Sequence, residues 1–232
     1  MTGTLRLYSL LWWCLLPFAF IRLLWRSRRE PGYRQHLAER FGFYSLQLSA
    51  PLICVHAVSV GETRAAEPLL RALLSEYPDH HILLTHMTPT GHATGKALFG
   101  NEPRLTQAYL PYDTLSMMTN FMQHFRPRLC ILMETEVWPS LIEACKAADV
   151  PVALINARLS ERSLQRGQRF AGLLGRAAAQ ITVVAAQSEA DAQRLRVMGA
   201  REVNVTGNLK FDVSVPAAMI TAGQSLRQQI GD

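Results

Sequence analysis

The sequence lacks the short motifs that mark the common nucleotide-binding and hydrolytic α/β enzymes. No GxGxxG follows the first strand that we predict, no GK[ST] completes a phosphate-binding loop, and no GxSxG is present. These absences argue against a dinucleotide-dependent enzyme, an NTPase and an α/β-hydrolase.

Disulfide and metal-binding patterns are missing too. The four cysteines form no CxxC pair, and two of them, Cys54 and Cys130, fall inside predicted strands, which favours reduced thiols in a cytosolic core. The densest group of histidines lacks the spacing of metal ligands: His80, His81, His86 and His92. We therefore expect neither a metal ion nor another cofactor. With 49% hydrophobic and 18% charged residues, the chain is not disordered.

The positive charge is concentrated near the N-terminus. Residues 1–40 contain seven arginines and two glutamates, a formal charge of +5 out of +6 for the whole chain. A nucleic-acid-binding domain normally carries its basic patch on the folded body. We therefore expect no nucleic-acid partner.

An apolar segment precedes most of these arginines. Residues 7–21 carry no charge, and with residues 23–25 beyond Arg22 the stretch reaches the ~20 residues that a bilayer core requires. Because arginines follow it, the pattern predicts a membrane anchor and basic flank over residues 1–30, with the rest of the chain on the cytoplasmic side. Arg26, Arg28 and Arg29 would contact anionic phospholipid head groups. A buried N-terminal helix is the alternative, and the anchor can either span the bilayer or lie in its interface.

From residue 51 onward, strand-like runs alternate with helix-like segments. We predict strands at 51–57, 81–87, 106–111, 128–133, 151–156, 181–186 and 203–207, and helices at about 62–76, 89–99, 114–125, 139–148, 160–178 and 188–198. This alternation indicates an α/β fold, a doubly wound parallel sheet with right-handed crossovers. Pro68 either kinks the first of these helices or marks its true start.

Carboxylates directly follow two of the predicted strands. The strand at 128–133 runs into Glu134 and Glu136, and the strand at 51–57 leads into Ser59, Gly61 and Glu62. The carboxyl ends of parallel strands share one edge of the sheet, where open α/β sheets bind their ligands. The two junctions therefore predict an active site at this edge.

Glu62 is the candidate general base. Beside Gly61 at a helix N-terminus, the helix dipole favours its ionised form, and a fixed carboxylate can take a proton from a hydroxyl group. An ordinary helix-capping glutamate is the alternative.

The other charged candidates lie after later strands. Glu134 and Glu136 are close enough to shift each other's pKa, with a structural ion pair to a residue such as Arg158 as the alternative. Lys210 is the one cation of the segment that follows the last strand, and a surface lysine is its alternative.

Eight ordered motifs extend over essentially the whole chain: PGYR at 31–34, ERFG at 39–42, SVGET at 59–63, MTPTG at 87–91, YLPYD at 109–113, METEVWP at 133–139, NARLS at 156–160 and GNLKFD at 207–212. Together they resemble the Kdo transferases of lipid A and lipopolysaccharide core assembly. These enzymes transfer 3-deoxy-D-manno-oct-2-ulosonic acid (Kdo) from CMP-Kdo to the lipid A precursor.

The resemblance implies a GT-B glycosyltransferase, with residues 31–232 as its acceptor-binding Rossmann-like domain. Family members are nearly twice this length, so the C-terminal domain that binds CMP-Kdo is expected outside this chain. Localisation at the inner membrane, in contact with its phospholipids, is also implied. A catalytically silent acceptor-binding fragment and a GT-B enzyme that uses a UDP-sugar are the alternatives.

The resemblance also assigns roles to residues. It implies an inverting, metal-independent transfer with Glu62 as the base. Glu134 or Glu136, together with Lys210, would stabilise the charged transition state. The same motifs supply the residues expected to bind substrate: Ser59, Gly61, Thr88, Gly91 and Arg158.

Overall fold

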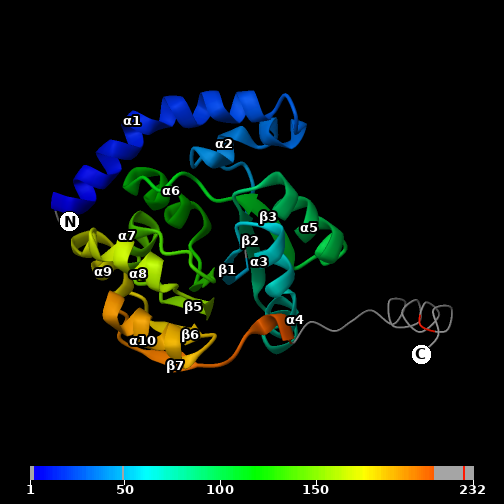
Figure 1. Cartoon of the computed structure of the whole chain (residues 1–232). Helices are drawn as coiled ribbons and strands as arrows, with labels where there is room; N and C mark the ends of the chain where they lie inside the picture. The colour runs from blue at the N-terminus through cyan, green and yellow to red at the C-terminus, as the bar shows by residue number, and fades with distance from the viewer. Residues whose placement is uncertain (1–2, 49, 212–226, 228–232) are drawn as a thin grey trace.

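A seven-stranded parallel sheet forms the centre of the protein in a computed structural model that describes residues 3–48, 50–211 and 227 (Figure 1). The strand order is β3-β2-β1-β4-β5-β6-β7, which is the doubly wound arrangement predicted from the sequence. The strands are β1 Leu52–His56, β2 His81–His86, β3 Leu105–Tyr109, β4 Leu129–Met133, β5 Val152–Ala157, β6 Val183–Ala186 and β7 Val203–Val205.

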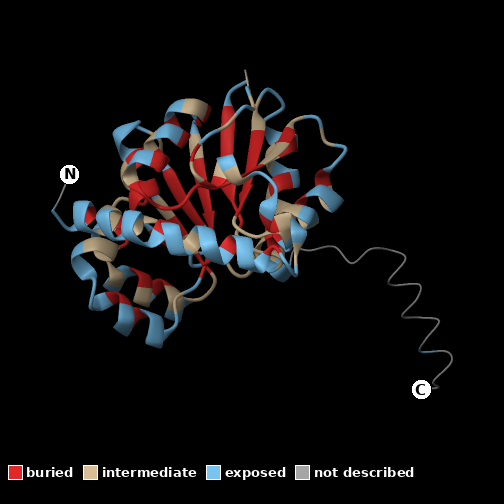
Figure 2. Cartoon of the chain, turned by 90° about the horizontal axis from the view of Figure 1, so that it is seen from above, coloured by how far each residue is buried: buried red, intermediate tan, exposed pale blue. Residues whose placement is uncertain are grey.

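Helices cover both faces of the sheet because successive strand residues point to opposite sides. In β1, Leu52 and Cys54 pack in one core with α6, α7, α9 and α10, whereas Ile53 and Val55 pack in a second core with α3, α4 and α5. The helices are α1 Gly3–Arg26, α2 Leu37–Arg40, α3 Val60–Ala65, α4 Glu67–Glu76, α5 Pro89–Phe99, α6 Leu115–Phe125, α7 Pro139–Ala147, α8 Glu161–Gln168, α9 Ala171–Ala178 and α10 Glu189–Met198, with short 3-10 turns at η1 Pro31–Arg34 and η2 Leu209–Phe211. Figure 2 shows the buried strands between these layers.

Two helices that we predicted as continuous are each divided in two. The segment 62–76 forms α3 and α4, and Pro68 lies in the first turn of α4, so it marks a helix start. The segment 160–178 forms α8 and α9, because Phe170 leaves the helical conformation between them. Pattern alone missed the second break, because no proline marks it.

The N-terminal helix α1 lies along the outside of the domain (Figure 1). It contacts α7 and α9, and also η1. Leu16 and Leu23 are buried against Tyr33, Tyr112 and Met117. The rest of the helix is mostly exposed, as Figure 2 shows, so the alternative of a buried N-terminal helix is wrong. By length and composition, α1 is the one described helix that could cross a membrane.

A buried carboxylate joins α1 to the domain. The Asp113 side chain accepts hydrogen bonds from the Ser140 and Leu141 backbone N–H groups, at 3.1 and 3.0 Å, and so caps α7. The Tyr8 hydroxyl donates to the same carboxylate over 2.9 Å. Burial raises the pKa of Asp113 to about 6, and these hydrogen bonds oppose the rise.

Replacing Asp113 should therefore cost much more stability than removing the hydroxyl that reaches it from α1. We expect Asp113→Ala to lower the free energy of unfolding by about 2–4 kcal/mol, because it leaves two buried N–H groups without an acceptor. Tyr8→Phe keeps both caps and should cost only about 0.5–1.5 kcal/mol. Urea unfolding in detergent micelles measures both, and equal losses would contradict the capping role.

Candidate active site

The strand order reverses between β1 and β4, and the predicted carboxylates flank this switch point. Glu62 lies in α3, which follows β1, whereas Glu134 and Glu136 directly follow β4. Lys210 lies in η2, which packs against α3, and Arg158 directly follows β5. The five charged residues predicted from the sequence are therefore brought to one edge of the sheet. Their catalytic roles stay a prediction.

Glu62 is held by two hydrogen bonds within its own turn. The Val58 backbone N–H donates to Oε2 over 2.7 Å, and the Ser59 hydroxyl donates to Oε1 over 3.1 Å. These are the contacts of a helix-capping glutamate. Burial raises the pKa of Glu62, the two hydrogen bonds oppose the rise, and the nearby charge of Glu134 adds to it. A carboxylate with a raised pKa takes up a proton more readily near neutral pH.

On one side, the backbone beside Glu62 is hydrogen-bonded to the segment that follows β2, and on the other side, at Gly61, it has free space. The Thr88 hydroxyl donates to the Val58 carbonyl over 3.0 Å and accepts from the Gly91 N–H over 3.1 Å. A Cβ on Gly91 would meet the Val58 oxygen at 3.1 Å, so glycine allows this close packing. At Gly61, by contrast, a Cβ would meet nothing within 4 Å. Thr88 and Gly91 thus contact the protein itself here, and substrate binding by them stays a prediction.

Glu134 is a buried carboxylate that two cations neutralise. Its side chain is 6% exposed, and its backbone lies in the left-handed region at φ 55°. Arg158 contacts Oε2 through Nε and Nη2, at 2.9 and 2.8 Å, and Lys210 Nζ lies 3.4 Å from Oε1. The ion pair that we offered as the structural alternative for Glu134 is therefore present, and it lies inside the candidate site.

Glu136 is the third carboxylate of the site, and its pKa is strongly shifted. Its Oε2 accepts a hydrogen bond from the Trp138 indole N–H over 2.7 Å. Burial raises the pKa of Glu136 to about 7, and the negative charges of Glu62 and Glu134 add to the rise. Of the shifts predicted from the spacing of the two glutamates, the structure shows the one at Glu136, and Glu62 contributes more to it than Glu134 does.

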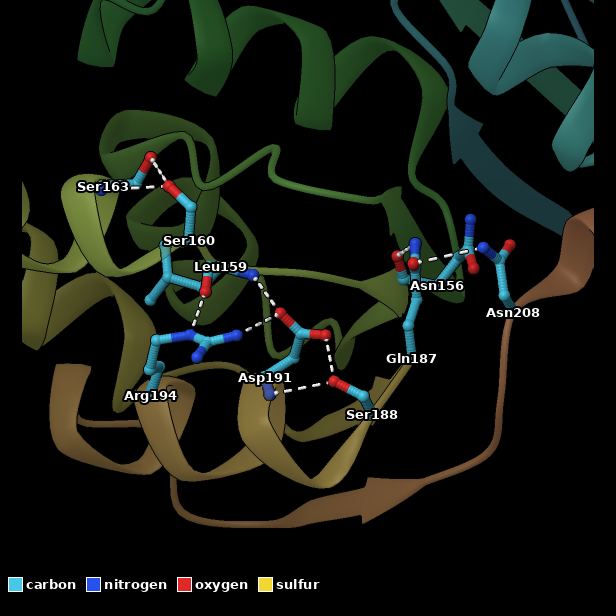
Figure 3. A network of polar contacts seen from close by, with 9 residues as sticks. All are labelled: Asn156, Leu159, Ser160, Ser163, Gln187, Ser188, Asp191, Arg194 and Asn208. Atoms are coloured by element: carbon cyan, nitrogen blue, oxygen red, sulfur yellow. Dashed lines mark hydrogen bonds and ion pairs between the residues drawn. The ribbon is translucent and has the colours of Figure 1, made fainter.

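The loop that carries Arg158 is fixed by α10, as Figure 3 shows. The Asp191 carboxylate accepts the Leu159 backbone N–H over 2.9 Å and a guanidinium N–H of Arg194 over 3.0 Å. Arg194 also donates to the Leu159 carbonyl. Both backbone groups of the residue after Arg158 are thus bonded to one helix turn.

Sequence analysis did not find the residues that support the site through these hydrogen bonds. It singled out neither Asp191 nor Arg194. Trp138 and Asn156 lie inside motifs that we quoted, but neither was given a role. No local pattern connects these residues to the site, because Asp191, Arg194 and Asn156 bond to backbone groups 32–53 positions away, and Trp138 bonds across a turn.

No group of three His, Cys, Asp or Glu side chains within residues 3–48, 50–211 and 227 is arranged to hold a metal ion. All four cysteines are free, and three are buried, including the two that we placed in strands. The expectation that the reaction needs no metal and no cofactor stays a prediction.

Solved structures with the same architecture define the class of the fold. A UDP-GlcNAc 2-epimerase from Neisseria meningitidis, bound to UDP-GlcNAc, matches 77% of this chain and 52% of its own chain, with a TM-score of 0.54 and 15% identity. A Staphylococcus aureus MnaA structure with UDP matches 75% and 51%, with a TM-score of 0.53. The likeness establishes a Rossmann-like domain of the GT-B type.

The sequence places the chain more narrowly. Residues 35–213 match the family model for 3-deoxy-D-manno-octulosonic-acid transferase (kdotransferase), and the chain belongs to that family. It is 42% identical over 218 residues to the 3-deoxy-D-manno-octulosonic acid transferase of Bordetella pertussis, and 40% identical over 216 residues to that of Haemophilus influenzae. Each match covers 91% of this chain and 50% of the relative, so the chain spans about half the length of the curated relatives it matches.

The raised pKa of Glu136 predicts a pH-dependent stability. Folded Glu136 keeps its proton up to about pH 7, whereas the unfolded chain releases it near the ordinary value of 4.5. The folded state therefore binds more protons between these values, and its stability falls as pH rises from about 4.5 to 7. Glu136→Gln should remove up to about 3 kcal/mol of this decline.

Urea unfolding at several pH values measures the slope. The exposed Glu76→Gln serves as the control, since it removes a carboxylate from a distant helix end. If Glu136→Gln and Glu76→Gln kept the same slope as the unmodified protein, the shifted pKa of Glu136 would be refuted.

Proposed function

We propose that this chain is the acceptor-binding half of a glycosyltransferase that moves Kdo from CMP-Kdo to a hydroxyl group of the lipid A precursor. Membership of the kdotransferase family supports the reaction class. The observation that carries the proposal is the arrangement of Glu62: its carboxylate is fixed by two hydrogen bonds and has a raised pKa, and the space beside Gly61 is open. The donor would be bound by the domain that the longer relatives possess.

In this reaction the acceptor hydroxyl oxygen attacks the anomeric carbon of Kdo while the bond from that carbon to the CMP phosphate breaks. The hydroxyl proton passes to Glu62, and CMP leaves with the bonding electrons. Attack from the face opposite the leaving group inverts the anomeric centre. General-base removal of the proton typically contributes ~10²–10⁴ to the rate.

The other charged residues of the site would stabilise the negative charge on the donor during this step. Glu134 is already paired with Arg158 and Lys210, so their net positive charge is available to the carboxylate of Kdo and to the departing phosphate. Glu136, with a pKa of about 7, is partly protonated at neutral pH and can donate a hydrogen bond to developing negative charge. Ser59 and Gly61 would lie beside the acceptor sugar, in the open space at Gly61. Thr88 and Gly91 would hold the backbone of this turn in place through the hydrogen bond to the Val58 carbonyl and the close packing against it.

Replacing the proposed base should abolish transfer and leave the fold intact. In a form of the protein that includes the donor-binding half, we expect Glu62→Gln to lower kcat by ~10²–10⁴, because the amide keeps the shape of the side chain but cannot take up the proton. Transfer of labelled Kdo to a lipid A precursor measures this. Glu76→Gln is the matched control and should keep full activity; wild-type turnover by Glu62→Gln would exclude Glu62 as the base.

The protein also acts at the inner membrane, with α1 lying in the bilayer interface and not across it. The helix is bonded to the domain near its start, where Tyr8 meets Asp113 and Ser9 accepts the Leu115 N–H. Near its end, the Arg26 guanidinium lies 4.4 Å from the centre of the Tyr33 ring. A helix that crossed the bilayer would have to give up these contacts at one end at least.

The exposed side of α1 has the chemistry of an interfacial helix. Its apolar side chains turned to solvent include Leu10, Trp13, Phe18 and Ile21, each more than half exposed. Arginines follow at its C-terminal end, where they would meet anionic phospholipid head groups. This arrangement holds the domain, and hence the acceptor site, on the cytoplasmic surface.

Cys14 gives a direct test of the depth of α1. It lies at the middle of the helix and is the one exposed cysteine, because Cys54, Cys130 and Cys145 are buried. A fluorophore on Cys14 in vesicles should be quenched by nitroxides at an interfacial depth, ~5–10 Å into the head-group and acyl boundary. Quenching at the bilayer centre, ~15 Å from each surface of the hydrocarbon core, would instead show a spanning helix.

Charge placed on the same face should release the protein from vesicles. We expect Phe18→Glu to reduce co-sedimentation with anionic vesicles, whereas Val197→Glu, at another apolar position on α10 that is more than half exposed, should not. Equal effects of the two variants would contradict a role for α1 in membrane contact.

A further inference from the structure

The loop that carries Lys210 has little apolar packing of its own. None of the three residues of η2 is buried, and Phe211 is 89% exposed. Leu209 packs only partly against the core. The position of Lys210 against Glu134 therefore depends mainly on polar contacts made by the loop.

Asn156 supplies the central one of these contacts. Its side-chain Oδ1 accepts the Leu209 backbone N–H over 3.2 Å, one residue before Lys210. A second connection runs beside it: Gln187 donates to the Asn156 carbonyl over 2.9 Å and accepts from the Asn208 amide over 3.3 Å. Figure 3 shows Asn156, Gln187 and Asn208 together at this point.

The backbone of Asn156 has a conformation that suits this contact and is unusual in a strand. Its φ is 55°, in the left-handed region, and the pairing between β5 and β6 shifts register between Leu154 and Ala157. Such irregularities redirect a side chain, and asparagine tolerates the left-handed region better than most residues. Asn156 is 1% exposed, and its Nδ2 has no hydrogen-bond partner in the described chain. Within the described chain, Oδ1 is thus the polar side-chain atom of Asn156 that makes a hydrogen bond, and it binds the loop.

The same strand end also fixes Glu134. The Glu134 backbone N–H donates to the Ile155 carbonyl over 2.9 Å, and Ile155 immediately precedes Asn156. Glu134 is therefore bonded to Ile155, and Leu209, the residue before Lys210, is bonded to the next residue of β5, Asn156.

From these contacts we infer that Asn156 is a positioning residue for the candidate site: its side-chain oxygen holds the 207–211 loop so that the Lys210 ammonium lies against Glu134. The inference rests on the proposed function for its catalytic meaning. Its structural part, the placement of Lys210, can be tested without any transfer reaction.

Two substitutions distinguish the effect of the side-chain oxygen from that of the positive φ. Asn156→Gly accepts the positive φ and removes the acceptor, whereas Asn156→Asp also tolerates that φ and keeps an oxygen for the Leu209 N–H. The chain contains three lysines, Lys96, Lys146 and Lys210, so acylation of each can be followed by mass spectrometry with the other two as internal references.

We expect Asn156→Gly to increase the rate of Lys210 acylation by an N-hydroxysuccinimide ester by about two- to fivefold, the effect of releasing a half-exposed ion pair. Lys96 and Lys146 should not change, and Asn156→Asp should return Lys210 to the wild-type rate. If Asn156→Gly loses its cooperative unfolding transition, Leu209→Pro takes its place with the same expected increase, because it removes the N–H group that the Asn156 oxygen accepts at the first residue of η2. An unchanged Lys210 rate in a folded variant would overturn the inference.

The catalytic part is tested in the form that includes the donor-binding half. Asn156→Gly should lower kcat by about tenfold, with KM for the acceptor unchanged; this is less than the ~10²–10³ for complete loss of one preorganised contact, because Lys210 is displaced and not removed. Asn156→Asp should recover most of this loss, which a merely destabilised fold would not allow. If the wild-type enzyme transferred no Kdo, the proposed function would fail, whereas the labelling of Lys210 would still decide the role of Asn156. Full kcat in Asn156→Gly would overturn its catalytic part.

Discussion

The buried carboxylate of Glu134 is the interaction on which the arrangement of the site depends. An ionised carboxylate with 6% of its side chain exposed needs paired charges, and a lost partner would leave a costly buried charge. Its partners come from segments that follow two other strands, Arg158 after β5 and Lys210 after β7. One carboxylate thus ties together three loops at the sheet edge. Burial is the main cause of the raised pKa values of the neighbouring Glu62 and Glu136, and the negative charge of Glu134 adds to both.

The helix proposed to contact the membrane is hydrogen-bonded to the part of the domain that carries the candidate site. Tyr8 on α1 bonds to Asp113, and Asp113 caps α7, the helix that follows Glu134 and Glu136. The distance of the catalytic edge from the bilayer would then be set by packed protein and not by a flexible linker. With the proposed lipid acceptor, these contacts would bring its sugar hydroxyl to a fixed height above the membrane.

Much of the fold and part of the site could be predicted because they follow from local pattern. The alternation of strands and helices gave the doubly wound sheet, and carboxylates after two strands located the edge where Glu62 and Glu134 meet. The break at Phe170 could not be predicted, since it is set by the backbone conformation of one residue and no proline marks it. Likewise, the bond from Asn156 to Leu209 joins residues 53 positions apart and depends on a register shift that no sequence pattern reports.

The attachment of α1 to the domain also dictates an order of events during synthesis. Tyr8 and Asp113 are separated by 105 residues, and the α7 cap that orients Asp113 lies 27 residues further on. At typical translation rates, ~5–20 residues per second, α1 would leave the ribosome several seconds before its docking site exists. During that interval an apolar helix has only lipid or a chaperone to cover it. With the proposed interfacial position of α1, insertion would come first, and the domain would complete its folding against a helix already at the membrane.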